Sequence, residues 1–208
     1  MRLPTITIAA AALALLAAAG PAAAANVTPP RAGQVGIGLQ LGYGSLLKGG
    51  GAGDTFADGL TYTVRLRYRM RYDRGFGLSF ESSRFDSRVR VPWNPDKPDD
   101  NVAPERLGTV LSGIELYQMF GTRTPTVRMI SVGLGIGQHR VKLNSGETEL
   151  SGKYSGDGPF LSAGAGIERF FYRSWAADVS VRYYAMFKDG VASHNVQVAL
   201  GVIGYAGY

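Results

Sequence analysis

The sequence predicts an all-β protein, an eight-stranded antiparallel up-and-down transmembrane β-barrel. Eight segments alternate apolar residues with small or polar ones, which is the two-residue side-chain period of a β-strand. The connections between these segments alternate mainly between long and short, as expected for a meander of hairpins. The polar positions carry mainly Gly, Ser and Ala, which fit the narrow interior of an eight-stranded barrel.

The N-terminal segment has the layout of a secretory signal peptide. It reads MRLPTITIAAAALALLAAAGPAAAAN, in which one arginine is followed by an apolar run and then by small residues. We therefore expect residues 1–25 to be cleaved and residues 26–208 to form one barrel domain. A membrane anchor fits less well, because the run is short and no stop-transfer pattern follows it. The chain has no cysteine, which excludes disulfides and a lipoprotein acylation site.

The first predicted strand is GQVGIGLQLGY (33–43), which places Val35, Ile37 and Leu39 on one face. The same alternation recurs in seven more segments: 60–72, 75–83, 109–120, 127–140, 159–171, 174–187 and 194–208. Strands of about 9–12 residues suit a tilted crossing of a bilayer.

The second segment, LTYTVRLRYRMRY (60–72), carries an arginine at every second position: Arg65, Arg67, Arg69 and Arg71. A helix would distribute these residues around its circumference, whereas a strand places all four on one face. The segment is therefore a long two-faced strand. By itself it leaves open which face meets which solvent.

The connections predict how the strands are joined. Long connections occupy 44–59, 84–108 and 141–158, short ones occupy 73–75, 121–126 and 172–173, and the last, 188–193, is intermediate. Eight strands joined in this way can close on themselves and leave no unpaired edge. The long connections then lie at one end of the barrel and the short ones at the other.

Two kinds of barrel fit this alternation: a secreted, lipocalin-like barrel with its apolar residues inside, and a membrane barrel with them in lipid. The small residues on the polar face favour the membrane barrel, since they make little sense on a water-exposed surface. Aromatic residues gather near strand ends, as two interfacial girdles require. The formal net charge of +6 does not indicate a nucleic-acid partner, because the arginines are patterned along strands and a secreted chain rarely meets nucleic acid.

This pattern resembles the small eight-stranded outer-membrane barrels of Gram-negative bacteria, the class of outer membrane protein A's transmembrane domain and outer membrane protein X. The resemblance covers nearly all of residues 26–208 and includes the last strand, VQVALGVIGYAGY, which ends in Tyr208. It implies an integral outer-membrane protein with periplasmic termini and short turns, and with long extracellular loops. It also implies that the barrel-assembly machinery reads Tyr208, although Ala206 stands where another aromatic residue is common.

In a membrane barrel the arginines point inward, where they need partners because an unpaired buried charge is costly. The same parity adds five more charged residues to the interior: Glu81, Glu115, Glu168, Asp178 and Arg182. A three-residue loop at 73–75 would make Arg67 and Glu81 cross-strand neighbours. From the opposite wall, Glu168 and Asp178 would bind Arg65 or Arg69. We expect this network to plug the barrel.

The leading functional hypothesis is a non-enzymatic barrel with a structural or surface-interaction role, without catalytic residues, cofactor or metal. The second hypothesis is a small channel or a conduit for small or apolar solutes, and the third is a lipid A-modifying enzyme. Some similar barrels are lipid A enzymes with a His-x-Ser pair on a strand. Neither His139 nor His194 has serine two residues on, and Ser193 faces away from His194 in a strand.

The expected partners are outer-membrane lipids, lipopolysaccharide and the barrel-assembly machinery, and we expect a monomer. An extracellular ligand would bind through loops 44–59, 84–108 and 141–158, because loops on a rigid scaffold often carry function. The tip of the longest loop holds Asp96, Asp99 and Asp100. Their spacing matches no defined cation-binding loop, so a solvated tip is favoured over a cation site.

Overall fold

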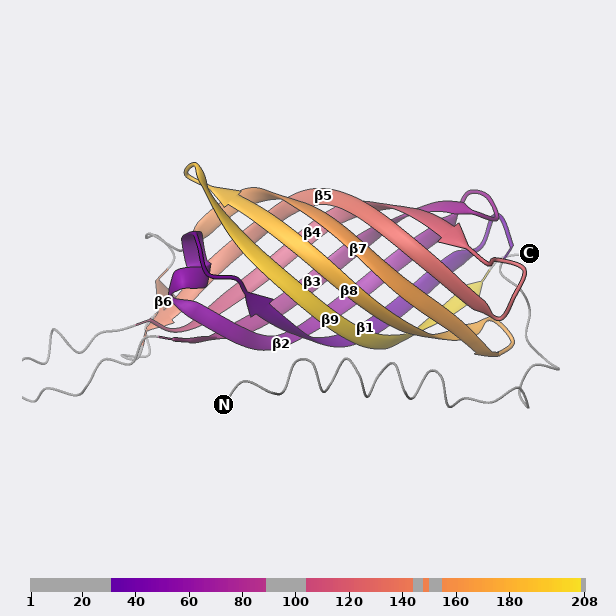
Figure 1. The fold of residues 1–208 in the computed structure, drawn as a ribbon, viewed down its shortest axis with the longest axis horizontal. Helices are drawn as coiled ribbons and strands as arrows, with labels where there is room; N and C mark the ends of the chain where they lie inside the picture. The colour runs from indigo at the N-terminus through magenta and orange to yellow at the C-terminus, as the bar shows by residue number, and fades with distance from the viewer. Residues whose placement is uncertain (1–30, 89–103, 144–147, 150–154, 207–208) are drawn as a thin grey trace, which may run out of the picture.

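A computed structural model describes residues 31–88, 104–143, 148–149 and 155–206. Within these ranges the chain forms a closed antiparallel barrel with tilted strands (Figure 1). Eight strands form its wall: β1 (Val35–Leu46), β2 (Phe56–Arg69), β3 (Arg74–Ser87), β4 (Pro104–Phe120), β5 (Thr126–Leu143), β7 (Gly156–Tyr172), β8 (Trp175–Lys188) and β9 (Val191–Ala206). Each pairs with the next, and β9 pairs with β1, which closes the barrel and confirms the predicted topology.

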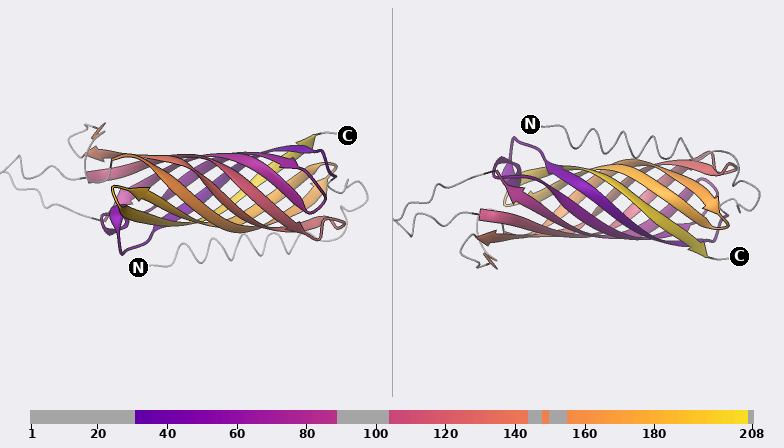
Figure 2. Two further views of the ribbon diagram at one scale, coloured as in Figure 1. Left: turned by 90° about the horizontal axis from the view of Figure 1, so that it is seen from above. Right: turned by 90° about the horizontal axis from the view of Figure 1, so that it is seen from below.

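The two ends of the barrel differ. At the loop end lie the 3-10 turn η2 (Gly51–Asp54) and the short strand β6 (Thr148–Glu149), which pairs with β5 (Figures 1 and 2). The opposite, turn end carries the short connections. The β8–β9 connection at the loop end is tighter than predicted: only Asp189 and Gly190 lie between the strands, with φ of 48° and 77°. An Asp-Gly pair suits the left-handed backbone of a two-residue hairpin turn. Within the described ranges, no helix is long and apolar enough to span a membrane.

The outer face of the barrel is apolar. Ile37, Leu39 and Ile136 are 58%, 65% and 68% exposed, and residues two apart along the strands repeat this pattern. A continuous apolar surface of this kind would be unfavourable in water, and it is the surface that lipid requires. The alternation therefore turns the apolar side chains to the membrane and the polar ones to the interior.

The interior is layered along the barrel axis. A loop-end apolar layer consists of Leu46, Ala52, Phe56, Phe85, Leu107 and Val141. A turn-end layer consists of Tyr117, Met119, Val127, Met129, Phe170, Ala176, Ile203 and Tyr205. On β2, Phe56 lies at the loop end and the buried arginines lie towards the turn end, so most of the buried charge lies between the two layers.

The loop-end layer is fixed by polar contacts around it. The Ala52 N–H of η2 donates a hydrogen bond of 2.9 Å to Ser193 Oγ on β9. The Arg88 guanidinium donates to the carbonyl oxygens of Phe56 and Leu46, both at 2.8 Å. The first loop therefore packs against the barrel wall at the loop end, where its Ala52 joins the apolar layer.

The predicted register between β2 and β3 is wrong. Arg67 pairs with Gly77 rather than Glu81, and the turn is longer than three residues, with the Arg71 N–H bonded to the Arg74 carbonyl at 3.0 Å. Packing explains the shift, because each buried arginine of β2 then lies opposite a small residue. A Cβ atom on Gly77 would come within 2.2 Å of the Leu66 carbonyl oxygen, so this site holds only glycine.

Candidate functional site in the barrel interior

Three arginines of β2 form one wall of the charged interior. Arg65, Arg67 and Arg69 are 1%, 5% and 2% exposed, since alternate residues of the strand all face the lumen. The prediction that Arg71 joins them is wrong. Arg71 is exposed and lies in the turn, because β2 ends at Arg69.

Glu168 on β7 is the centre of the largest ion-pair group. It accepts a hydrogen bond from Arg67 through Oε1 and one of 2.8 Å from Arg69 Nη2 through Oε2. The Tyr205 hydroxyl contacts both carboxylate oxygens, at 2.7 and 2.9 Å. Glu168 is fully buried, so its charge is balanced by two guanidinium groups and one hydroxyl rather than by water.

Asp178 on β8 extends this group across the lumen. Its Oδ2 lies 2.9 Å from Arg67 Nη2, and its Oδ1 accepts a hydrogen bond from the Gln40 side chain on β1. Arg67 therefore bridges two carboxylates on adjacent strands. The expected contact between the opposite wall and Arg69 is present, whereas Asp178 binds Arg67 rather than Arg65 or Arg69.

Aromatic rings line the same arginines. The Arg69 guanidinium carbon lies 4.5 Å from the Tyr205 ring centre, and that of Arg67 lies 5.0 Å from the Tyr117 ring centre. Rings at these distances stabilise a cation through their electron-rich faces. They also fill the lumen at the turn end.

A second ion pair joins β4 and β8. Arg182 donates to Glu115, and the Tyr117 hydroxyl donates to the other oxygen of the same carboxylate. Arg182 and Glu115 are 3% and 2% exposed. This pair links two walls that are not neighbours in the sheet.

Arg65 and Glu81 are bound differently. Glu81 accepts hydrogen bonds from Tyr184 at 2.8 Å, Ser83 at 3.1 Å and Thr63 at 3.4 Å, and the described residues give it no ion pair. The predicted Arg67–Glu81 contact is therefore wrong, as the register requires. Arg65 reaches only Ser180 Oγ at 3.5 Å, and within the described part of the chain its Nε and Nη2 have no hydrogen-bond partner.

The buried charges balance. With Arg71 outside, the described interior holds four arginines (Arg65, Arg67, Arg69 and Arg182) and four carboxylates (Glu81, Glu115, Glu168 and Asp178). We call these eight residues the charge layer.

Little space remains around the charge layer. The cavity bounded by Arg67, Arg69, Glu168 and Tyr205 leaves about 10 Å³ for the centre of a water molecule. A second cavity, beside Arg65 and Asp178, leaves about 0 Å³. One water molecule needs about 10–15 Å³ by this measure, so these gaps do not admit a hydrated ion.

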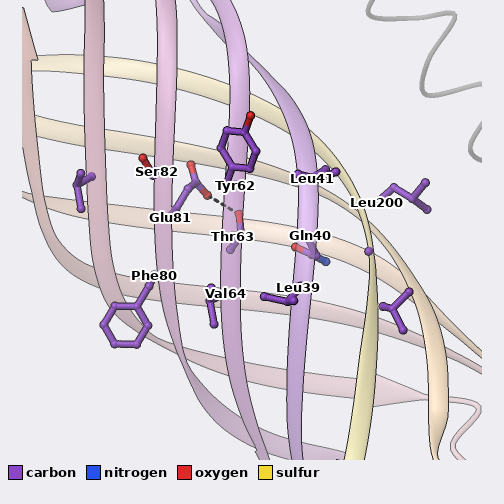
Figure 3. Close-up of a pocket in the computed structure, with 13 residues that line it drawn as sticks. Leu39, Gln40, Leu41, Tyr62, Thr63, Val64, Phe80, Glu81, Ser82 and Leu200 are labelled. Atoms are coloured by element: carbon purple, nitrogen blue, oxygen red, sulfur yellow. Dashed lines mark hydrogen bonds between the residues drawn. The ribbon is translucent and has the colours of Figure 1, made fainter.

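A larger hollow lies on the other side of the wall. It is lined by the exposed side chains of Leu39, Tyr62 and Phe80 (Figure 3). The buried Thr63 and Glu81 lie beside them and are joined by a hydrogen bond. This hollow is a trough on the lipid-facing surface across β9, β1, β2, β3 and β4. It does not extend the lumen.

The two histidines lie at the loop end on opposite faces. His139 is buried, with Nδ1 2.7 Å from Thr109 Oγ1, and within the described ranges no carboxylate contacts it. His194 packs outside, with Nδ1 2.6 Å from the Tyr183 hydroxyl. Sequence reasoning missed both contacts, because each joins neighbouring strands and depends on register. The Tyr208 signal and the Asp96–Asp100 tip lie outside the described residues.

The sequence matches the family described as outer membrane protein beta-barrel domain over residues 8–203. A search of curated protein sequences found no match.

Several solved structures share the fold. Neisserial surface protein A has a TM-score of 0.57 and 16% identity, covering 82% of this chain and 95% of its own. OprG from Pseudomonas aeruginosa has a TM-score of 0.59 and 10% identity, covering 88% and 100%. Ail, the attachment invasion locus protein of Yersinia pestis, has a TM-score of 0.52 and 15% identity, covering 83% and 99%. Because the family match spans most of the sequence and the barrel has the same architecture as these outer-membrane proteins, the chain belongs to the outer membrane protein beta-barrel domain family and is an integral outer-membrane protein.

Proposed function

We propose that this protein is a closed, non-enzymatic barrel that holds extracellular loops on a rigid scaffold and does not conduct ions. The observation that carries the proposal is the charge layer, whose four arginines and four carboxylates border described gaps too small for a hydrated ion. The two interior layers of apolar and aromatic side chains support it, since an ion would have to cross both.

The orientation is part of the same proposal. The termini and the short turns face the periplasm, and the long loops 44–59, 84–108 and 141–158 face the outside. Ligands and lipopolysaccharide would contact these loops, and the barrel-assembly machinery would read Tyr208. One similar barrel is named an attachment invasion locus protein, which is consistent with a role carried by surface loops.

Planar bilayer recording tests the closed lumen. The wild-type barrel should show no steady conductance. Glu168→Ala should conduct ions, or it should unfold at a lower temperature in a gel-shift melt. The reason is that the substitution leaves Arg69 without its carboxylate partner. Glu105→Ala, at an exposed glutamate of the loop end, is the matched control and should behave as wild type. A large, steady wild-type pore would refute the proposal and favour the channel hypothesis.

A further inference from the structure

The turn end carries a group of arginines that the barrel interior does not use. Six exposed arginines surround this end: Arg31, Arg71, Arg74, Arg123, Arg128 and Arg173. We call them the arginine collar. In the described part of this end the only solvent-accessible acidic residue is Asp73, which is half-buried and whose Oδ2 lies 3.7 Å from Arg74 Nε. The collar therefore has a strong excess of positive charge.

The loop end is different. Its described, solvent-accessible basic residues are Lys48, Arg84, Arg88, Arg106, Arg140, Lys142 and Lys188, and its acidic ones are Asp54, Asp58, Asp86, Glu105, Asp157 and Asp189. Two ion pairs join neighbouring strands there: Arg106 with Asp86 at 3.6 Å and Lys142 with Glu105 at 3.7 Å. The loop end thus neutralises most of its own charge, and the collar does not.

The collar borders the aromatic belt on the lipid-facing surface. Arg128 is the cross-strand partner of Phe120, which is 48% exposed, and the Arg173 guanidinium lies 5.2 Å from the centre of the Tyr172 ring. Aromatic side chains of a membrane barrel mark the level of the lipid headgroups. Guanidinium groups at that level meet headgroup phosphates, which they bind with two parallel hydrogen bonds.

We propose that the arginine collar binds the phosphodiester groups of anionic phospholipids in the leaflet next to the short turns. The proposal rests on the orientation proposed above, which places the turns in the phospholipid leaflet rather than among lipopolysaccharide. Charge complementarity supports this partner, because the collar offers cations and almost no acidic group of its own. The collar would then fix the depth of the barrel and retain a shell of anionic lipid.

The test uses the whole barrel, reconstituted in vesicles of phosphatidylcholine and phosphatidylglycerol. The measurement is the enrichment of spin-labelled phosphatidylglycerol over spin-labelled phosphatidylcholine at the protein surface. We expect wild-type enrichment of about fivefold, the factor for one arginine beside an anionic lipid. Enrichment should fall towards one in Arg74→Gln/Arg128→Gln/Arg173→Gln. The matched control, Arg84→Gln/Arg106→Gln/Arg140→Gln, removes three exposed arginines of the loop end and should keep the wild-type value.

Salt provides a check that needs no variant. Raising NaCl from about 0.1 M to about 1 M shortens the Debye length from about 10 Å to about 3 Å, so the enrichment should decrease. The proposal would be overturned if the collar variant kept the enrichment, or if the control variant lost it equally. It would also be overturned if salt left the enrichment unchanged. The proposal would also be overturned if the wild-type barrel were retained on insoluble peptidoglycan and showed no preference for phosphatidylglycerol. Conductance is recorded separately, so a failure of the collar and a failure of the closed lumen can be distinguished.

Discussion

Two buried glutamates of the interior show how differently one barrel can hold the same charge. Glu168 is surrounded by two guanidinium groups and the Tyr205 hydroxyl, whereas Glu81 is held by three hydroxyl groups. Both side chains are almost completely buried, and both occupy inward-facing positions of their strands. Burial and parity therefore do not decide which carboxylate forms an ion pair. The side chains that the strand register and the closure of the barrel place beside each carboxylate decide it.

The largest expected effect is that of Glu168→Gln. The substitution removes the negative charge that balances Arg69. It also removes part of the negative charge that balances Arg67. Breaking a buried ion pair by removing one partner typically costs about 3–5 kcal/mol, because the other charge stays buried. Urea unfolding in lipid vesicles, followed by tryptophan fluorescence, should show a decrease of this size in the free energy of unfolding.

The control for this prediction is Glu105→Gln, whose carboxylate lies at the surface 3.7 Å from Lys142 Nζ. Exposed pairs of this kind contribute about 0–1 kcal/mol. Equal losses in the two variants would mean that the buried pairs stabilise the barrel no more than surface pairs do.

A smaller effect is expected for Tyr205→Phe. Phenylalanine keeps the aromatic ring that stacks on Phe170 and faces Arg69, and it loses only the hydroxyl that contacts Glu168. A hydrogen bond to a charged group contributes about 1.5–3 kcal/mol. The same unfolding measurement should give a loss in this range, and additivity with Glu168→Gln would show that the hydroxyl acts independently of the carboxylate.

Glu81→Gln should cost less again. The amide keeps an oxygen that accepts from Tyr184, and no arginine loses an ion-pair partner. We expect a loss of about 1 kcal/mol, the net contribution of a typical hydrogen bond. A loss as large as that of Glu168→Gln, measured side by side, would show that Arg65 depends on the Glu81 charge in solution, and it would remove the distinction between the two glutamates.

The sequence predicted the fold and the inward parity of all eight residues of the charge layer, because strand alternation needs no tertiary information. It wrongly added Arg71, which lies in the turn. It did not predict which charges meet. A glycine at position 77 and a long turn shift β3 against β2, and that shift moves Glu81 from Arg67 to Thr63. Tyr205 shares the inward parity of its strand, so the pattern could have included it. Its contact with Glu168 depends on the barrel's closure.

The smallest expected effect is that of Arg71→Gln. This substitution tests whether the last arginine of the LTYTVRLRYRMRY segment contributes less to stability than the three before it. Arg71 is exposed in the turn, and substitutions at such sites usually change the free energy of unfolding by less than about 0.5 kcal/mol. Arg69→Gln, two residues earlier, is the matched comparison, because it leaves Glu168 with one guanidinium fewer and should cost several times more. Urea unfolding of the two variants in the same vesicles measures the difference. If Arg71→Gln destabilises the barrel as much as Arg69→Gln, the charge layer extends beyond the end of β2 and the four arginines form one unit after all.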